Sequence, residues 1–346
     1  MSRPHRVAVL MGGQSSEHDV SLMSARAVIA ALEATGHEVL PIVISRQGVW
    51  RVDDAVVTLA RDADGRAICL GLDGSSRWDL DVVFPVLHGP NGEDGTVQGL
   101  LECAGVAYVG AGVAASALAM DKVLFKGVLR TAGIPTPDHV VVTAGDWAAD
   151  PAAARVRVAD GVGFPSFSKP ARLGSSVGIS RVTGPGELDA ALVLALRHDP
   201  KVIVERGVVG GREIEVGVLA GDPAVASPVG EIGYDAEWYD YATKYEPGRM
   251  TLSVPADIPA RAAERARELA LRAFVAAECD GLARVDFFLC QDGTVVLSEL
   301  NTMPGFTPTS VYAALMGAAG IAYDDLIVRL LALAVERADR RRAYLG

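Results

Sequence analysis

Residues 284–301 read RVDFFLCQDGTVVLSELN, two strand-like runs joined by Asp292-Gly293. Asp-Gly between two such runs is a strong signal for a β-hairpin with a two-residue turn. This turn would place Asp286 opposite Glu299 and Arg284 opposite Asn301. Residues two apart on a strand share a face, so these four side chains are expected to project from one side of the hairpin.

This face of the hairpin is a candidate metal site. Two carboxylates that face each other across a hairpin repel unless a cation lies between them. Asp286, Glu299 and Asn301 offer only oxygen ligands, which favour Mg2+ over zinc. A solvated hairpin with an arginine–acid network would give the same pattern. We favour the metal site, because the alternate residues are apolar and indicate a half-buried hairpin.

Length and composition limit the classes of protein to consider. The chain has 346 residues, which suggests two or three domains at roughly 150 residues each. It is 50% hydrophobic and 22% charged, as in globular proteins with substantial cores. This composition excludes a disordered chain, a collagen-like repeat and a disulfide miniprotein. The formal net charge of −11 makes the chain a poor general binder of nucleic acid or anionic membranes, so an anionic substrate would need a locally basic site.

The cysteines and the apolar runs bear on the compartment. No pair of cysteines has CxxC spacing, so neither a zinc site nor a disulfide framework is predicted. The apolar run at 7–11 is too short for a signal-peptide core. No stretch approaches the ~20 apolar residues of a membrane span. We therefore expect a cytoplasmic protein.

A small-residue loop and the scarce lysines indicate a phosphate site. Residues 174–178 read GSSVG, and backbone N–H groups of such a loop can cradle phosphates, although most such loops are simple turns. Lys169, on the approaching strand, favours the phosphate interpretation. Only five basic residues are lysines and the others are arginines. A lysine retained in such a chain can supply a compact charge to a phosphate, with chance as the alternative. Gly12-Gly13 lacks GxGxxG spacing, so no dinucleotide site is supported.

The first third of the chain alternates strands and helices. Strands are predicted over 7–11, 39–44 and 81–87. Helices are predicted over 19–34 and from the end of the 88–95 loop to 104. This β-α-β order predicts a parallel sheet with helices on its faces. A helix over 121–131 and the breaker GIPTP at 133–137 then lead to a second domain. Further strands are predicted over 165–169, 178–182, 202–205, 212–219, 281–290 and 294–300, and helices over 187–196, 258–278, from 310 and over 325–339.

Some features of the remaining sequence have both a functional and a structural interpretation. Residues 233–248 are rich in Tyr, Asp, Glu and Gly without periodicity, and such a stretch in a compact domain is more often functional than accidental. Glu17 is an acid near a helix N-terminus, which it would stabilise by a few tenths of a kcal/mol, roughly. Ser310 is a candidate N-cap, although that helix N-terminus could also receive a substrate carboxylate. His88 lies at a strand-to-loop junction, so both kinds of role are open.

Taken together, the motifs resemble those of D-alanine–D-alanine ligases in order and spacing, over essentially the whole chain. The resemblance implies the ATP-grasp fold, with a parallel α/β domain at 1–120, a central domain at 121–210 and a C-terminal domain at 211–346 that carries a lid loop, 233–248. ATP would lie between the last two. The motifs are GGQSSEHDVS (12–21), HGPNGEDGT (88–96), MDK (120–122), KP (169–170), GSSVG (174–178), YDYATKY (239–245), RVD (284–286) and ELNTMPGFT (299–307).

The resemblance also implies how ATP is bound. Lys122 and Lys169 would contact the ATP phosphates together with Ser175 and Ser176 of the loop, and Lys244 would approach the transferred phosphoryl group. Two Mg2+ (or Mn2+) ions would be held by the hairpin residues already singled out, Asp286, Glu299 and Asn301. The remaining ATP contacts implied are Glu205 and the backbone near Val208 for adenine, and Glu213 for the ribose.

The two amino-acid substrates follow by the same resemblance. Glu17 would bind the ammonium group of the first D-alanine, with His88 nearby, and Ser310 the carboxylate of the second. Arg284 and the Gly305 N–H would stabilise the tetrahedral oxyanion. A hydrogen-bonded trio of Glu17, Ser175 and Tyr245 would tie the lid over the site.

The implied activity is ATP-dependent formation of D-alanyl-D-alanine through an acyl phosphate, for peptidoglycan synthesis. The resemblance also implies a homodimer; neither nucleic acid nor a membrane is expected as a partner. One alternative is a D-alanine–D-lactate or D-alanine–D-serine ligase with the same core. Another, from a different class, is a nucleotide-binding oxidoreductase or a binding protein built on the N-terminal α/β pattern.

Overall fold

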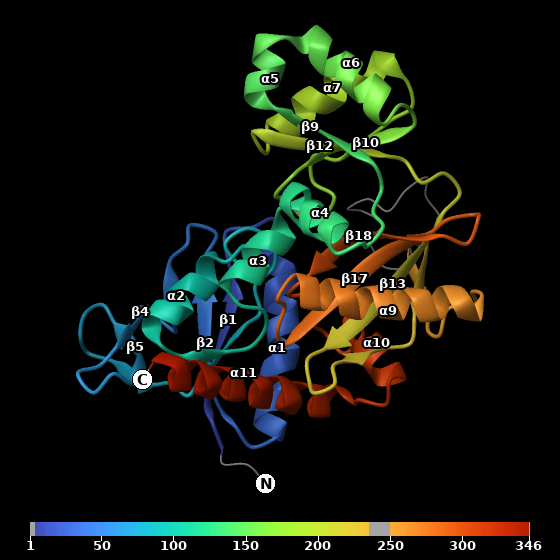
Figure 1. The fold of residues 1–346 in the computed structure, drawn as a ribbon. Coiled ribbons are helices and arrows are strands. Elements are labelled where there is room, and N and C mark those ends of the chain that lie inside the picture. The colour runs from blue at the N-terminus through green and yellow to red at the C-terminus, as the bar shows by residue number, and fades with distance from the viewer. Residues whose placement is uncertain (1–3, 235–249, 346) are drawn as a thin grey trace.

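The computed structural model describes residues 4–234 and 250–345. In this part of the chain the strands form three sheets, of eight, four and six strands. Figure 1 shows the N-terminal sheet with its helices beside the C-terminal sheet, and the central sheet with helices α5 to α7 on the far side of α4. None of the helices in these residues combines the length and the apolar composition that crossing a membrane requires.

The N-terminal sheet is only partly parallel. Its strand order is β6-β5-β4-β3-β2-β1-β7-β8, and β1 pairs in parallel with both β2 and β7. The predicted parallel core is therefore correct, but the residues between the second and third predicted strands form further antiparallel strands that the sequence pattern did not reveal. The elements are β1 (Arg6–Gly12), α1 (His18–Ala34), β2 (Glu38–Ile44), β3 (Trp50–Val52), β4 (Ala55–Arg61), β5 (Ala67–Gly71), β6 (Arg77–Asp79), β7 (Val82–Pro85), α2 (Thr96–Ala104), β8 (Ala107–Tyr108) and α3 (Val113–Met120).

The turn between β1 and α1 depends on glycine. Gly12 has φ +90°, and a Cβ there would lie 2.3 Å from the Ile44 carbonyl oxygen. Glycine alone accepts this conformation and this close approach without strain. The Gly12 N–H donates to Ser21 Oγ at 2.8 Å, and Ser21 Oγ donates to the Val86 carbonyl. The turn thereby places Glu17, the residue before α1, over the carboxyl ends of β1 and β7.

The central sheet is antiparallel, in the order β11-β10-β12-β9. One side carries a buried cluster that includes Val158, Leu192 and Val204. Helix α4 (Lys122–Thr131) precedes this sheet, with Asp121 as its N-cap accepting from Val123 N and Leu124 N. The other elements are β9 (His139–Thr143), α5 (Ala144–Ala149), α6 (Pro151–Gly161), β10 (Ser166–Pro170), β11 (Ser180–Val182), α7 (Pro185–Leu196) and β12 (Lys201–Arg206).

The C-terminal sheet has the order β16-β15-β13-β17-β18, with β14 paired to β13. Helix α9 packs on its apolar face, where Leu269, Phe274 and Val285 are buried. The elements are β13 (Arg212–Leu219), β14 (Val225–Ala226), β15 (Gly230–Tyr234), β16 (Met250–Ser253), α9 (Ala260–Ala276), β17 (Leu282–Leu289), β18 (Val295–Asn301), α10 (Val311–Ala318) and α11 (Tyr323–Leu345).

The β17–β18 hairpin has the predicted pairing at the site but a different turn. Asp286 faces Glu299 and Arg284 faces Asn301. The two-residue turn is wrong: Cys290 N donates to the Thr294 carbonyl at 2.8 Å, which closes a three-residue loop with Gly293 at φ +84°. The register then shifts between Asp286 and Phe287, a β-bulge that restores the predicted pairs.

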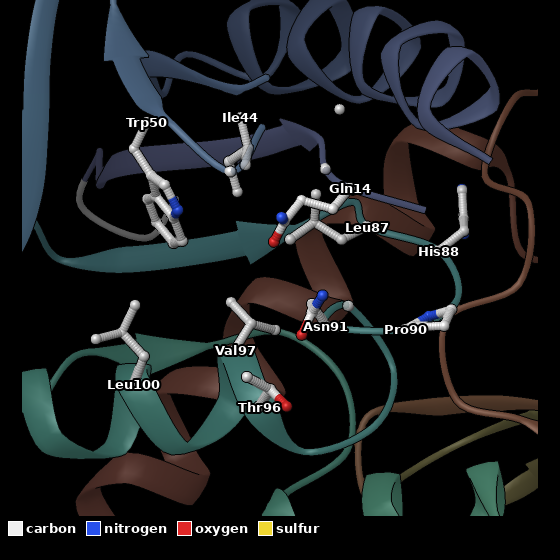
Figure 2. A pocket seen from close by; sticks show the side chains of 14 residues that line it. Gln14, Ile44, Trp50, Leu87, His88, Pro90, Asn91, Thr96, Val97 and Leu100 are labelled. Carbon is white, nitrogen blue, oxygen red and sulfur yellow. The ribbon is translucent and has the colours of Figure 1, made fainter. Parts of the chain in front are cut away.

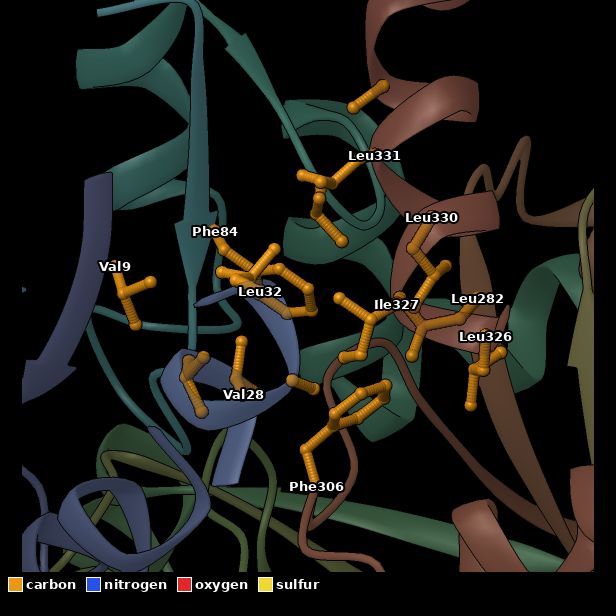
Figure 3. Packing of buried hydrophobic residues seen from close by; sticks show 14 of the residues in the cluster. Val9, Val28, Leu32, Phe84, Leu282, Phe306, Leu326, Ile327, Leu330 and Leu331 are labelled. Carbon is orange, nitrogen blue, oxygen red and sulfur yellow. The ribbon is translucent and has the colours of Figure 1, made fainter. Parts of the chain in front are cut away.

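The N-terminal sheet and the C-terminal residues share one core. Figure 3 shows Phe84, with Leu32 of α1, facing Ile327 and Leu330 of α11, with Phe306 beside them. Arg337 of α11 also stacks over the Tyr108 ring at 4.2 Å and donates to the Tyr108 carbonyl. This shared core fixes the loop that carries Gly305 and Ser310 against the β1 and β7 ends.

Candidate active site

A cavity of about 480 Å3 lies between the central and C-terminal sheets. It is lined by β10 and β12 of one sheet and by β13, β15, β17 and β18 of the other. Most of the ATP and metal residues predicted from the sequence line it. They are Lys122, Lys169, Ser175, Ser176, Glu205, Val208, Glu213, Asp286 and Glu299.

The carboxylates of the hairpin face this cavity together with cations of the protein. Arg284 donates to both Asp286 carboxylate oxygens, at 2.8 and 2.7 Å, and Asn301 Nδ2 donates to Asp286 Oδ2 at 2.9 Å. Lys122 Nζ lies 3.9 Å from Glu299 Oε2. Within the described residues, no group of three or more His, Cys, Asp or Glu side chains is placed to hold a metal ion. The candidate set is therefore two carboxylates and an amide, whose oxygen donors fit Mg2+ or Mn2+.

Glu205 binds two lysines at the back of the cavity. Lys169 Nζ is 2.8 Å from Glu205 Oε2, and Lys126 Nζ is 3.2 Å from Glu205 Oε1. Burial alone would raise the pKa of the Glu205 carboxyl, but the charges of Lys126 and Lys169 lower this pKa to about 2. Glu205 is therefore a buried anion and a strong hydrogen-bond acceptor.

The GSSVG loop has a strained backbone beside this cavity. Ser175 and Ser176 have φ values of 51° and 56°, in the left-handed region that non-glycine residues seldom adopt. Such strain is concentrated at ligand-binding sites. Lys122 Nζ donates to the carbonyl of Leu173 at 2.7 Å, so the lysine and the loop are held together. On the opposite wall the Tyr234 hydroxyl donates to Glu213 Oε1 at 2.8 Å.

A second group of titratable residues lies near the Gly174 end of the GSSVG loop. It consists of Glu17, His88 and Glu93. A Cβ on Gly89 would lie 2.9 Å from Glu17 Oε2, and one on Gly174 would lie 3.6 Å away. The structure therefore places Glu17 beside the loop that carries Ser175.

His88 is buried, and its Nδ1 donates to the Met303 carbonyl at 2.9 Å. Burial lowers the pKa of His88, with Arg284 adding to this and Glu17 opposing it. The neutral ring then carries an acceptor at Nε2, which has no hydrogen-bond partner among the described residues. His88 also lines a second cavity of about 220 Å3, where Trp50 and Ile44 face Val97 and Leu100 of α2 (Figure 2).

Ser310 and Gly305 lie next to each other at the start of α10. Ser310 is the N-cap residue by position, but its hydroxyl makes no capping hydrogen bond to the helix. It accepts instead from Thr307 N at 2.9 Å. A Cβ on Gly305 would lie 3.4 Å from Ser310 Oγ. Ser310 is therefore at the predicted N-cap position but does not cap the helix with its side chain. Lys244 and Tyr245 lie outside the described residues.

Three further residues of this region, Lys126, Glu215 and Glu93, were not predicted from the sequence. Lys126 holds Glu205, as described above. Glu215 Oε2 lies 3.0 Å from Arg284 Nε. Glu93 accepts from Gly89 N at 2.6 Å and Met303 N at 3.1 Å, and burial, with the charge of Glu17, raises its pKa to about 8. The scarcity of lysine in the sequence is a signal that could have found Lys126, because it applies to Lys126 as well as to Lys169.

The central and C-terminal sheets, with a lysine- and carboxylate-lined cavity between them, define an ATP-grasp ligase. The family described as D-ala D-ala ligase N-terminus matches residues 6–111, and that described as D-ala D-ala ligase C-terminus matches residues 128–332. The chain belongs to the D-alanine–D-alanine ligase family.

Named relatives cover nearly the full length. The D-alanine–D-alanine ligase of Deinococcus radiodurans is 50% identical over 96% of this chain and 98% of its own. That of Geobacillus kaustophilus is 43% identical over 96% and 95%. Among solved structures, the D-Ala:D-Ser ligase VanG from Enterococcus faecalis has a TM-score of 0.86 and 35% identity over 96% of this chain and 100% of its own. The D-alanine–D-alanine ligase from Coxiella burnetii has a TM-score of 0.86 and 32% identity over 99% and 97%.

Proposed function

We propose that this enzyme joins two D-alanines to D-alanyl-D-alanine at the expense of ATP, for peptidoglycan precursor synthesis. The observation that carries the proposal is the convergence on one cavity of Lys122, Lys169, the strained serine loop and the carboxylates of Asp286 and Glu299. Compact cations and backbone donors suit phosphates, and opposed carboxylates suit the metal ions that accompany ATP.

ATP would lie with its base at Glu205 and its phosphates at Lys122, Lys169 and the loop of Ser175 and Ser176. The ionised Glu205 carboxylate suits the amino group of adenine, with the backbone near Val208 and the carboxylate of Glu213 completing the nucleoside site. Asp286, Glu299 and Asn301 would hold two Mg2+ or Mn2+ ions. When bound, these ions would neutralise the charge of the phosphates.

The first chemical step is transfer of the γ-phosphoryl group to the carboxylate of the first D-alanine. The bond from the γ-phosphorus to the bridging oxygen breaks, and ADP and an acyl phosphate form. Glu17 would hold the ammonium group of this substrate, and His88 would assist through its acceptor nitrogen Nε2. Lys244 would approach the phosphoryl group in transfer.

In the second step the amine of the second D-alanine attacks the acyl carbonyl, a proton is lost and phosphate leaves. Arg284 and the Gly305 N–H would stabilise the tetrahedral oxyanion. Ser310 would bind the carboxylate of the second D-alanine. Because an acyl phosphate hydrolyses in water, the site must close, and we assign this role to the 233–248 segment through Tyr245, Ser175 and Glu17.

A second candidate is a ligase that takes D-serine or D-lactate as its second substrate. The D-Ala:D-Ser ligase VanG is 35% identical with a TM-score of 0.86, so the fold itself does not distinguish the second substrate. The higher identity to ligases named for D-alanine favours the dipeptide. We further propose domain boundaries at 1–120, 121–210 and 211–346, a homodimer and a cytoplasmic location.

The experiment traps the intermediate. The enzyme is incubated with ATP, Mg2+ and D-alanine in the presence of hydroxylamine, which attacks an acyl phosphate to give D-alanyl hydroxamate. Hydroxamate formation that requires both ATP and D-alanine would support the proposal. ADP release without hydroxamate or dipeptide would refute an acyl phosphate route.

A further inference from the structure

Lys126 is a fully buried lysine directly behind the nucleotide cavity. Its relative exposure is 0%, and it is absent from the residues that line the cavity. It lies on α4, one turn after Lys122. Its ammonium group contacts Glu205 Oε1 at 3.2 Å and donates to the Ser298 carbonyl at 3.2 Å. A buried lysine is costly and is retained only when paired, so its partner Glu205 is the clue to its role.

The two oxygens of the Glu205 carboxylate contact two different lysines, one that lines the cavity and one that does not. Lys169 holds Oε2 at 2.8 Å and lines the cavity, whereas Lys126 holds Oε1 from behind. Under the proposed function, Lys169 also binds the ATP phosphates, which carry more negative charge than one carboxylate. A bound nucleotide would therefore compete with Glu205 for Lys169 while Glu205 recognises the base.

We propose that Lys126 is the positioning residue of the nucleotide site, which keeps Glu205 ionised and aimed at the base while Lys169 serves the phosphates. The inference rests on the proposed function, because it takes Glu205 as the adenine-binding residue. Lys126 makes no contact with the nucleotide and acts only through Glu205.

The chemistry of the base gives this role a specific signature. An ionised carboxylate accepts from the 6-amino group of adenine and repels the 6-oxo group of hypoxanthine. A protonated carboxyl carries an O–H donor, which suits a 6-oxo group. Among the described residues, the charged groups that contact Glu205 are Lys126 of α4 and Lys169 of β10. His139 is its titratable cross-strand neighbour on β9. Glu213 and Glu299 act on Lys169 from the opposite wall. Lys126 is the cation in this group that the nucleotide does not recruit.

The test measures equilibrium dissociation constants of ADP and IDP by calorimetry at pH 6 and pH 8. The full-length enzyme is compared with Lys126→Met and with Lys126→Gln, which keeps a donor but loses the charge. Lys201→Met is the matched control, because Lys201 pairs with Asp121 and does not line the cavity. We expect the preference for ADP over IDP to fall about tenfold in both Lys126 variants, and further at pH 6, because one charge-assisted hydrogen bond is lost. The control should keep the wild-type preference.

Several outcomes would overturn the inference. If the Lys126 variants bind both nucleotides with an unchanged ratio, or weaken both equally, Lys126 supports only the fold. If neither variant folds by circular dichroism, its role is structural and the inference is wrong. The Glu205→Gln variant distinguishes failure of the inference about Lys126 from failure of the proposed function. If that variant keeps the wild-type ratio, Glu205 does not read the base; if it loses the preference while the Lys126 variants keep it, only the inference about Lys126 fails.

Discussion

Replacing Glu93 by glutamine should raise the free energy of unfolding relative to wild type, and this difference should grow as the pH rises. The Glu93 carboxyl accepts from two backbone N–H groups, and burial together with Glu17 raises its pKa from 4.5 to about 8. Between these values the folded protein keeps a proton that the unfolded chain has released. Folding stability therefore falls with increasing pH across this window. Glutamine keeps an acceptor oxygen for one of the N–H groups and has no titration.

The size of the effect follows from the two pKa values. Each pH unit within the window corresponds to about 1.4 kcal/mol for one proton. Between pH 5 and pH 8, the stability of Glu93→Gln relative to wild type should increase by about 3.5 kcal/mol. This is less than three full steps, because the carboxyl is partly titrated at each end of the interval. His88, whose pKa is lowered by burial, contributes with the opposite sign. Its contribution is present in both proteins and cancels in the difference.

The assay is urea unfolding of the ligand-free enzyme at half-unit steps of pH, followed by circular dichroism. Glu33→Gln, an exposed site on α1, is the matched control and should show a flat difference from wild type. A flat difference for Glu93→Gln as well would mean that Glu93 is ionised in the folded state at neutral pH. The interpretation of this end of the site would then be wrong.

Other substitutions test the site in separate ways. Asp286→Asn should lower turnover by roughly a hundredfold while the fold survives, as checked by circular dichroism, and near-normal turnover would make the hairpin face structural only. Lys169→Arg should raise the KM for ATP although it keeps the charge, because a planar guanidinium cannot replace a compact ammonium between phosphate oxygens; an unchanged KM would refute the argument from lysine scarcity. Tyr245→Phe should gain use of D-lactate at low pH, where the competing amine is protonated, and chromatography of products from about pH 6 to pH 9 would show no change if Tyr245 is not the selector.

In the β17–β18 hairpin, the local sequence signals predicted the correct residue pairs at the site, although the predicted turn was wrong. Asp-Gly correctly marked the turn, but the structure has a three-residue loop and a β-bulge in place of the predicted two-residue turn. The two one-residue differences compensate, so Asp286 still faces Glu299. The antiparallel strands β3 to β6 were missed. Of these, β3 and β6 have only three residues each, too few for a period-2 pattern to be recognised.

The residues that the sequence did not reveal are those defined by long-range contacts. Lys126 and Glu205 are far apart in the chain, and a charged residue within an amphipathic helix is ordinarily a solvated one. Only the packing of α4 against β12 shows that this lysine is buried with a carboxylate. The raised pKa of Glu93 likewise depends on burial in the folded protein and on the charge of Glu17, a residue far from Glu93 in the chain.

The most direct test of the account is a competition between second substrates. The enzyme receives ATP, Mg2+ and D-alanine with equal concentrations of D-serine and D-lactate at neutral pH, and the products are separated and identified by mass. We expect D-alanyl-D-alanine as the main product, formed in equal amount with ADP and phosphate. D-alanyl-D-serine or D-alanyl-D-lactate as the main product, or phosphate release that does not depend on D-alanine, would contradict it.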